Sequence, residues 1–194
     1  MNNLLPFLGY VLATVFTPGP NNISSMSNAG RYGFGASLRY RLGIYFGFFV
    51  IQSLAALFSA FLLDVIPAVQ PYMLALGAAY ILWMAWKTFS SAPSGDADEP
   101  ARDNTFLSGL LLQFVNVKVI IFAITTMSVY AVPYSTSPLF LLAFGAAIAT
   151  FAFISINCWA AFGAVFSRAL HRHERAVNCV MALLLVWCAV SLYL

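Results

Sequence analysis

The chain has 194 residues, of which 62% are hydrophobic and only 8% charged, with a formal net charge of +3. A soluble domain usually has about 25% charged residues, so this composition excludes a soluble fold and requires the bilayer as solvent for most of the surface. The small net charge comes from a few loop arginines rather than a basic patch, which argues against a nucleic-acid partner. We therefore expect an all-α integral membrane protein.

Six apolar segments are long enough to cross a bilayer, since a membrane-spanning helix needs about 20 apolar residues. Their approximate bounds are 4–28, 42–63, 70–88, 106–130, 138–166 and 176–194. Residues 90–104 form the only polar connection of any length, and their composition predicts a solvated linker. This linker divides one membrane domain, residues 1–194, into two three-helix repeats at 1–89 and 105–194.

The first segment is interrupted by Thr-Pro-Gly-Pro-Asn-Asn at residues 17–22. Each proline removes a backbone donor and clashes with the preceding turn, and the glycine weakens a helix further. At membrane depth, broken backbone survives only where it is buried in protein or lines a wet cavity. We therefore predict a helix broken at mid-membrane, with Pro18, Gly19 and Pro20 at the break and in a binding site.

Asn21 and Asn22 follow this break and supply amide donors and acceptors. One interpretation is that they cap the half-helix that restarts after Pro20, and another is that they contact substrate, and the two roles are compatible. The N-terminus of that half-helix would point backbone N–H groups at the cavity, where they attract a carboxylate.

Small and aromatic residues mark the second and third segments. Gly43 and Gly47 have the spacing of a close helix–helix contact, and packing is the role we expect for them. In the third segment, Tyr80 follows Gly-Ala-Ala at 77–79. Tyr80 either lines the binding cavity or packs against other aromatic rings.

The fourth segment has a matching interruption, Gln-Phe-Val-Asn-Val-Lys at 113–118, in which Gln113 and Asn116 are further candidates for the site. Lys118 is the only Lys or Arg away from the ends of a predicted span, since Lys87 is the last residue but one of segment 70–88. It follows Phe106 by twelve residues, or about 18 Å of helix, which is near the middle of a hydrocarbon core roughly 30 Å thick. A charge at that depth costs on the order of 2.5–3.5 kcal/mol on insertion scales, which favours a functional role.

Two roles remain open for Lys118. Its ammonium could bind an anionic group such as an amino-acid carboxylate, or its deprotonated amine could relay a proton. No Asp or Glu lies deep in a predicted span, which weakens a carboxylate-based proton relay. In the fifth segment, Asn157 is a candidate for either an interhelical hydrogen bond or a ligand contact, and we favour the hydrogen bond.

The distribution of basic residues predicts the topology. Lys and Arg flank alternate connections, at Arg31, Arg39, Arg41, Lys87, Arg102, Arg168, Arg172 and Arg175. The connections near Asp64 and Pro133 have none. The positive-inside rule then places both termini on the outer side, and three spans per half give the halves opposite orientations, as in inverted-repeat transporters.

Catalytic and metal chemistry are not expected. The chain has no GxxxxGK[ST] motif, and His171 and His173 have no further metal ligands near them in the sequence. An enzyme would need a nucleophile with a base, or metal ligands, at membrane depth, and the sequence offers neither. A purely structural subunit would have little use for a broken helix and a central lysine.

Together these motifs resemble the LysE/RhtB superfamily of bacterial amino-acid exporters over nearly the whole chain. The resemblance rests on residues 17–22, 77–80, Trp83, 86–87, 113–118 and 157–159. Many members have Asn-Pro-Lys where this chain has Asn116-Val117-Lys118. The difference favours the cysteine/O-acetylserine exporter group and predicts a fourth span that is less sharply broken than the first.

The resemblance implies a secondary transporter that exports small amino acids across the bacterial inner membrane, driven by an ion gradient and without a cofactor. The expected partners are a small amino-acid substrate and the lipid bilayer, with a homodimer left open. The alternative is an uncoupled facilitator or channel for small polar metabolites, which the lack of an intramembrane acid favours.

Overall fold

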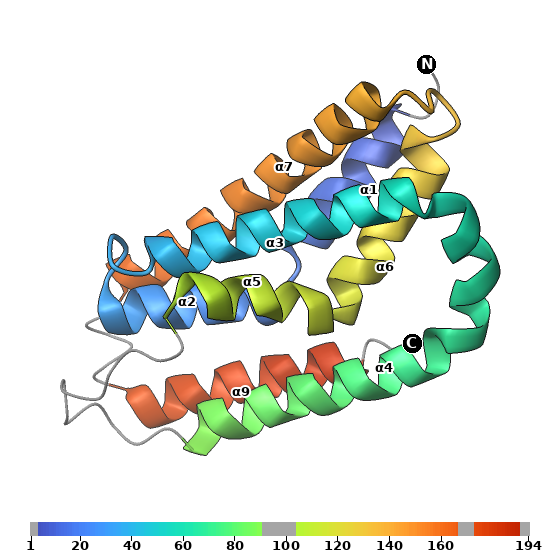
Figure 1. Ribbon diagram of the computed structural model, residues 1–194. Coiled ribbons are helices and arrows are strands. Elements are labelled where there is room, and N and C mark those ends of the chain that lie inside the picture. The colour runs from blue at the N-terminus through green and yellow to red at the C-terminus, as the bar shows by residue number, and fades with distance from the viewer. Residues whose placement is uncertain (1–3, 91–103, 167–172, 191–194) are drawn as a thin grey trace.

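The computed structural model describes residues 4–90, 104–166 and 173–190, and every regular element in these ranges is a helix (Figure 1). The elements are α1 (Leu4–Phe16), α2 (Pro20–Tyr32), α3 (Leu38–Leu57), α4 (Ser59–Ser90), α5 (Phe106–Val115), α6 (Val117–Thr125), the π-helical η1 (Thr126–Ala131), α7 (Pro138–Val165) and α9 (Glu174–Val190). The all-helical class is thus confirmed for these ranges. Most of the predicted linker 90–104 lies outside the described residues, as do Arg102, Arg168, His171 and Arg172.

Two helices among the described residues, α3 and α7, are long and apolar enough to cross a membrane. The α5 and α6–η1 pair counts as a third if it forms one span despite its 67° bend. Large apolar side chains are exposed on the outer surface, including Leu57 at 75%, Leu139 at 79% and Val165 at 75%. A surface of this kind suits lipid rather than water, which agrees with a membrane protein.

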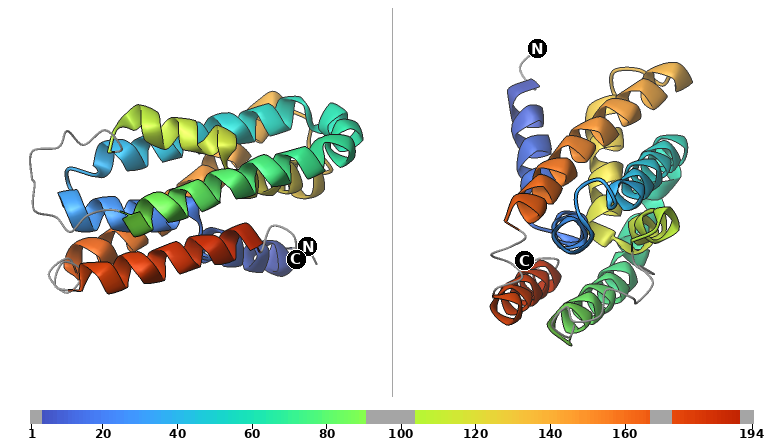
Figure 2. Two further views of the ribbon diagram at one scale, coloured as in Figure 1. Left: turned by 90° about the horizontal axis from the view of Figure 1, so that it is seen from below. Right: turned by 90° about the vertical axis from the view of Figure 1, so that its left-hand side faces the viewer.

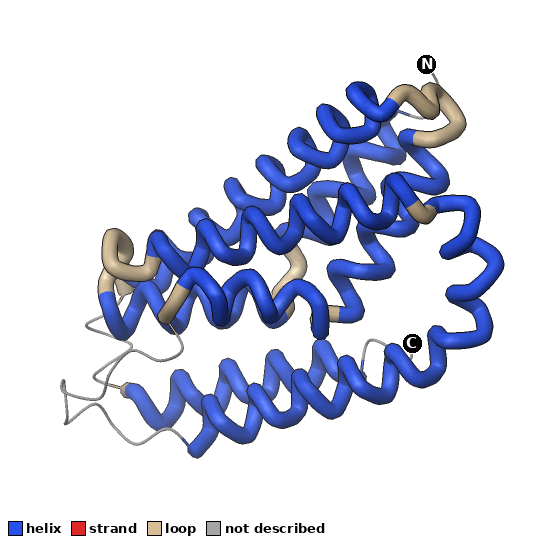
Figure 3. The backbone as a smooth tube through the Cα atoms, in the orientation of Figure 1, coloured by secondary structure: helices blue, strands red, loops and turns tan. Residues whose placement is uncertain are grey.

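The break predicted in the first segment is confirmed, because α1 ends at Phe16 and α2 begins at Pro20. Proline at the first helical position is favourable, since its missing N–H would have no partner there. Figure 2 shows that α1 and α2 run in clearly different directions. Figure 3 shows the break as a short loop segment enclosed by helices.

The second break, between α5 and α6, is shorter but still sharp. Asn116 is the single residue between the two helices, and its extended backbone (φ −85°, ψ 91°) turns the chain by 67°. The fourth segment is therefore broken even though residue 117 is valine rather than proline.

The connection predicted near Asp64 is wrong. Phe58 alone separates α3 from α4, and α4 continues from Ser59 to Ser90 through Asp64, Pro67 and Pro71. Figure 1 shows α4 curving around one end of the molecule before it runs back along the other helices. The prolines bend this helix without ending it, as prolines inside long helices commonly do.

The expected packing role of Gly43 and Gly47 is confirmed. A Cβ on Gly43 would lie 2.0 Å from the carbonyl oxygen of Phe106, and one on Gly109 would lie 2.1 Å from that of Tyr40. A Cβ on Gly47 would be 2.7 Å from the carbonyl oxygen of Leu110. Helices α3 and α5 therefore touch backbone to backbone along this seam, which fixes the position of the second break relative to α3.

Two apolar cores flank the breaks. The first lies between α1, α3, α6, η1 and α7 and includes Phe48, Phe122 and Met127. The second lies between α2, α4 and α9 and includes Ile23 and Leu185. Helices α4 and α9 pack on each other and form a separate pair beneath α2 and α5 (Figures 1 and 2).

Candidate functional site

The two breaks are joined by three side-chain amides. Asn21 Nδ2 donates a 2.8 Å hydrogen bond to Gln113 Oε1, and Gln113 Nε2 donates one of 3.0 Å to Asn21 Oδ1. Asn116 Nδ2 donates to the same Asn21 oxygen at 3.1 Å. We call Asn21, Gln113 and Asn116 the amide cluster. Gln113 is fully buried and Asn116 nearly so, which strengthens these hydrogen bonds and makes their loss costly.

Asn22 does not cap α2. The N-cap residue of α2 is Gly19, with no side-chain cap hydrogen bond among the described residues. Asn22 Nδ2 instead donates to the carbonyl oxygens of Val15 at 2.8 Å and Thr17 at 3.0 Å. The capping interpretation is therefore wrong for α2, and Asn22 satisfies carbonyl groups at the end of α1 that lack helical partners.

Side chains from distant helices satisfy other carbonyl groups at the first break. Ser155 Oγ on α7 donates to Val15 O at 2.7 Å, and Cys188 Sγ on α9 donates to Pro18 O at 3.1 Å. Sequence reasoning did not select these two residues. Ser155 is a small polar residue in an apolar segment, which is the one signal that could have identified it, whereas nothing in the sequence distinguishes Cys188.

Lys118 reaches the first break from the second. Its Nζ donates to the carbonyl oxygen of Thr17 at 3.2 Å. A Cβ on Gly19 would lie 3.3 Å from the same Nζ, so the glycine lets the ammonium lie against the backbone. The acidic residues of the chain lie elsewhere in the sequence, in α4, at residues 96–103 and at the start of α9.

The starts of α2 and α6 face one small cavity. The first intrahelical hydrogen bonds run from Ile23 N–H to Gly19 O in α2 and from Val119 N–H to Asn116 O in α6. The backbone N–H groups that precede Ile23 in α2 and Val119 in α6 have no acceptor within their own helices. The cavity, of about 40 Å³, is lined by residues of both helix starts together with Lys118. Two positive helix ends and one ammonium therefore converge on it, which suits a carboxylate.

The volume of this cavity limits what it holds in the conformation described. A water molecule needs about 10–15 Å³ of such space, so about 40 Å³ accommodates roughly three waters. An amino acid is larger than that. We call this space the Lys118 cavity, and in this conformation it is too small to hold a whole amino acid.

Asn157 lies away from the Lys118 cavity. Its Oδ1 accepts a hydrogen bond from Arg41 Nη1, and Arg41 Nη2 donates to the carbonyl oxygen of Phe34. The guanidinium carbon of Arg41 also lies 3.9 Å from the centre of the Phe34 ring. The favoured interpretation of Asn157 as an interhelical hydrogen-bonding residue agrees with this geometry.

The prediction that Lys118 is the only basic residue inside a span is wrong, because Arg41 is buried inside α3. Helix α3 begins at Leu38, four residues earlier than predicted, and Arg41 is fully buried within it. The predicted start at residue 42 left Arg41 in a loop by a single position. Its buried charge needs the hydrogen bonds that Asn157 and Phe34 supply.

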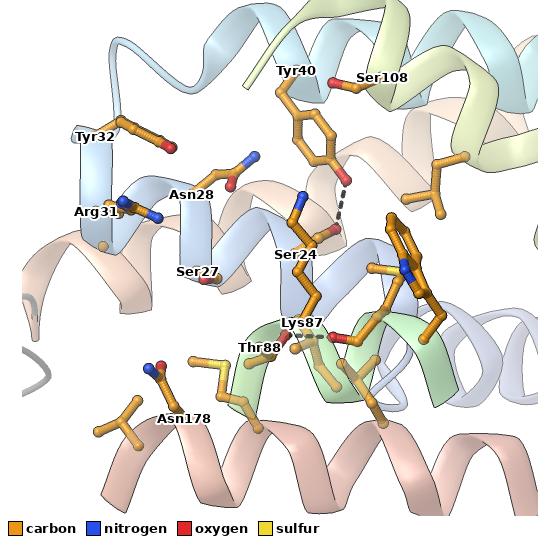
Figure 4. A pocket seen from close by; sticks show the side chains of 18 of the residues that line it. Ser24, Ser27, Asn28, Arg31, Tyr32, Tyr40, Lys87, Thr88, Ser108 and Asn178 are labelled. Carbon is orange, nitrogen blue, oxygen red and sulfur yellow. Dashed lines mark hydrogen bonds between the residues drawn. The ribbon is translucent and has the colours of Figure 1, made fainter. Parts of the chain in front are cut away.

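Tyr80 lines a second and larger cavity of about 220 Å³ (Figure 4). Its ring centre lies 5.6 Å from that of Trp83, so it both packs against an aromatic ring and lines a cavity. It is not part of the lining of the Lys118 cavity. Six of the ten residues selected from the sequence line the Lys118 cavity, namely Gly19, Pro20, Asn21, Asn22, Asn116 and Lys118. Two more, Pro18 and Gln113, are hydrogen-bonded beside it.

Residues 12–194 of the chain match the LysE type translocator family. The cysteine/O-acetylserine efflux protein of Salmonella typhimurium (strain LT2) is 37% identical over 190 residues, which cover 98% of this chain and 97% of the relative. The cysteine/O-acetylserine efflux protein of Escherichia coli (strain K12) is 36% identical with the same coverage. No solved structure gives a significant match to the chain.

Proposed function

The chain belongs to the LysE type translocator family, and from this premise we propose that it is a secondary transporter that exports small amino acids of the cysteine/O-acetylserine kind across the bacterial inner membrane. The relatives named for that efflux align with nearly the full length of this chain, which is the observation that supports the proposal. An uncoupled facilitator or channel is not favoured, because efflux is the activity in the relatives' names.

The proposed membrane arrangement has six crossings in two inverted repeats. The crossings are α1–α2, α3, α4, α5–α6–η1, α7 and α9. Two features support it: the helix ends alternate between the two ends of the molecule in Figure 1, and each repeat begins with a broken helix. Broken helices at corresponding positions of two repeats are typical of transporters whose substrate binds at mid-membrane.

The proposed orientation places the ends of α2 and α4 in the cytoplasm. Arg31 and Lys87 lie in the last turns of these helices, and Arg39 and Arg175 lie at the starts of α3 and α9. All four helix ends are at the same end of the molecule in Figure 1, opposite the N-terminus. The positive-inside rule then makes this end cytoplasmic and the N-terminus periplasmic.

The proposed substrate site is the Lys118 cavity with the amide cluster beside it. In the proposed cycle the substrate carboxylate replaces Thr17 O as the partner of Lys118 and lies at the starts of α2 and α6. The amides of Asn21, Gln113 and Asn116 exchange some of their mutual hydrogen bonds for bonds to the substrate. In the empty site the mutual pairing satisfies most of these polar atoms, and the buried Asn116 Oδ1, which has no hydrogen-bond partner among the described residues, is left to accept a hydrogen bond from the substrate.

Flux into proteoliposomes tests both the function and the site. Purified wild-type protein should move radiolabelled O-acetylserine or cysteine, and an imposed pH gradient should drive accumulation. Lys118→Met should lose a charge-assisted hydrogen bond worth roughly 1.5–3 kcal/mol, or on the order of 10- to 150-fold in affinity. Arg39→Met is the control for loss of a positive charge, because Arg39 is exposed at the start of α3.

The outcomes separate the roles of Lys118. Weak substrate binding in Lys118→Met supports carboxylate binding. Normal binding and exchange without pH-driven accumulation would instead assign Lys118 to proton transfer. Normal binding and normal accumulation would exclude both roles. A wild-type protein without any amino-acid flux would overturn the proposed function.

A further inference from the structure

The 220 Å³ cavity lies between α2, α3 and α5 on one side and the α4–α9 pair on the other. We call it the vestibule. It is about five times larger than the Lys118 cavity. By the same measure of about 10–15 Å³ for each water-sized group, the vestibule has room for roughly fifteen to twenty such groups, so it accommodates cysteine, with about seven non-hydrogen atoms, or O-acetylserine, with about ten.

The vestibule leads toward the amide cluster along one face of α2. Ser24 and Asn28 line it and follow Asn21 at intervals of three and four residues, which places all three on the same side of the helix. A chain of hydrogen bonds continues this connection. Tyr40 Oη donates to Ser24 Oγ at 2.8 Å, and Ser24 Oγ donates to the carbonyl oxygen of Pro20 at 2.6 Å. One wall of the vestibule is thus bonded directly to the first break.

The opposite wall combines a cation with aromatic rings. Tyr80, Trp83 and Lys87 line it from α4 at helical spacing, and Lys87 Nζ lies 5.5 Å from the centre of the Trp83 ring. Figure 4 shows Lys87 reaching from α4 toward Ser24 on α2 and Tyr40 on α3. A carboxylate suits the ammonium of Lys87, and an ammonium group suits the hydroxyl oxygens and the faces of the rings. This pairing matches the two charges of a zwitterion.

We propose that the vestibule is a loading site, distinct from the Lys118 cavity, for the small zwitterionic amino acid that the protein exports. The proposal rests on the proposed function, since it assigns the vestibule to the same substrate before translocation. Arg31 and Lys87 line it at the basic end of the molecule, so it receives substrate from the cytoplasm. In this proposal the amide cluster lies between the two spaces, since Asn21 lines the Lys118 cavity and Ser24, about one turn along α2, lines the vestibule. The substrate then passes the cluster when Asn21 changes hydrogen-bond partners.

Thiol protection at Ser27, which lines the vestibule, tests this assignment. Purified Ser27→Cys protein is treated with N-ethylmaleimide with and without O-acetylserine, which has no thiol of its own. Mass spectrometry reads the fraction modified at residue 27, so the native cysteines stay in place. At ten times the dissociation constant, modification should slow about tenfold, because the free fraction is 1/(1 + [L]/Kd). Ala36→Cys, in the exposed loop before α3, is the matched control and should react equally with and without substrate.

Two further measurements separate the loading site from the transport function. Modified Ser27→Cys should lose O-acetylserine flux in proteoliposomes, relative to wild type treated with the same reagent. Protection should persist when Lys118→Met is added, because the vestibule binds substrate without Lys118. Normal flux in unmodified Ser27→Cys without protection would overturn the loading site and leave the transport function intact. Protection that disappears in Lys118→Met would also overturn it, because substrate would then bind only at the Lys118 cavity.

Discussion

Asn21 and Gln113 exchange two side-chain hydrogen bonds although 92 residues separate them in the sequence. The pair links the start of α2, just after the first break, to the end of α5, just before the second. Each amide supplies the other with a donor and an acceptor, so the fully buried Gln113 and the partly buried Asn21 cost little in the empty protein. Removing one member leaves one atom of the other without its partner, either Oε1 of Gln113 or Nδ2 of Asn21, because Gln113 Nε2 still donates to Gly109 O and Asn21 Oδ1 still accepts from Asn116.

A double-mutant cycle measures this coupling. Asn21→Ala leaves buried amide atoms of Gln113 and Asn116 without a partner and should destabilise the protein by about 1–3 kcal/mol. Gln113→Ala should cost a similar amount, and the double mutant clearly less than the sum of the two. Denaturant unfolding in detergent supplies the three values. Strict additivity would mean that the two amides do not stabilise each other.

The breaks could be predicted from the sequence because their causes are local. Two prolines and a glycine cannot continue a helix, and the polar run at 113–118 is conspicuous in an apolar segment. The pairing of Asn21 with Gln113 could not be predicted, since it depends on how α2 and α5 pack. The backbone partners of Asn22 were missed for a related reason: its side chain turns back to α1, whereas capping rules consider only the helix ahead.

Two errors came from treating local signals as boundaries. The gap between the apolar segments 42–63 and 70–88 predicts a connection near Asp64, yet α4 passes through this gap and through Pro67 and Pro71 as a curved helix. The start of α3 was placed just after Arg41 because a charged residue lowers hydropathy. In the fold, Asn157 on α7 and the Phe34 carbonyl provide hydrogen bonds that let Arg41 be buried. Hydropathy along one segment does not register such partners from distant segments.

Removing the first break should abolish transport without preventing insertion. Pro18→Ala combined with Pro20→Ala lets the segment from α1 to α2 form a continuous helix, which draws Thr17 O away from Lys118 and Pro18 O away from Cys188. Apolar length is unchanged, so expression should remain near wild type. Proteoliposome flux should fall to background.

Pro138→Ala is the control, because Pro138 also occupies the start of a helix but lies in α7 away from the breaks. Wild-type flux in the double variant would show that the break is incidental.

Asn157 should affect stability rather than substrate affinity. Asn157→Ala removes an acceptor from the buried Arg41 guanidinium, and a hydrogen bond to a charged group is worth roughly 1.5–3 kcal/mol. Asn157→Asp keeps an acceptor and adds an opposite charge, so it should be more stable than Asn157→Ala. Thermal unfolding in detergent gives the stabilities and substrate titration gives the affinity. A large loss of affinity in Asn157→Ala with unchanged stability would return Asn157 to the substrate site.

Gly43→Ala should reduce both stability and transport. Alanine favours a helix over glycine by about 1 kcal/mol, so propensity alone predicts a gain. Against this, the new Cβ would lie 2.0 Å from the carbonyl oxygen of Phe106, a backbone atom that cannot move without the rest of α5. Overpacking typically costs 1–3 kcal/mol, and here relief requires α5 to shift from α3, which moves Gln113 and the second break away from Asn21. We therefore expect the clash to outweigh the helix propensity of alanine, with a lower unfolding temperature and reduced flux in proteoliposomes.

Gly35→Ala is the control, because a Cβ there meets no atom within 4 Å, and it should behave like wild type. If Gly43→Ala were as stable and active as Gly35→Ala, the backbone contact between α3 and α5 would not position the site.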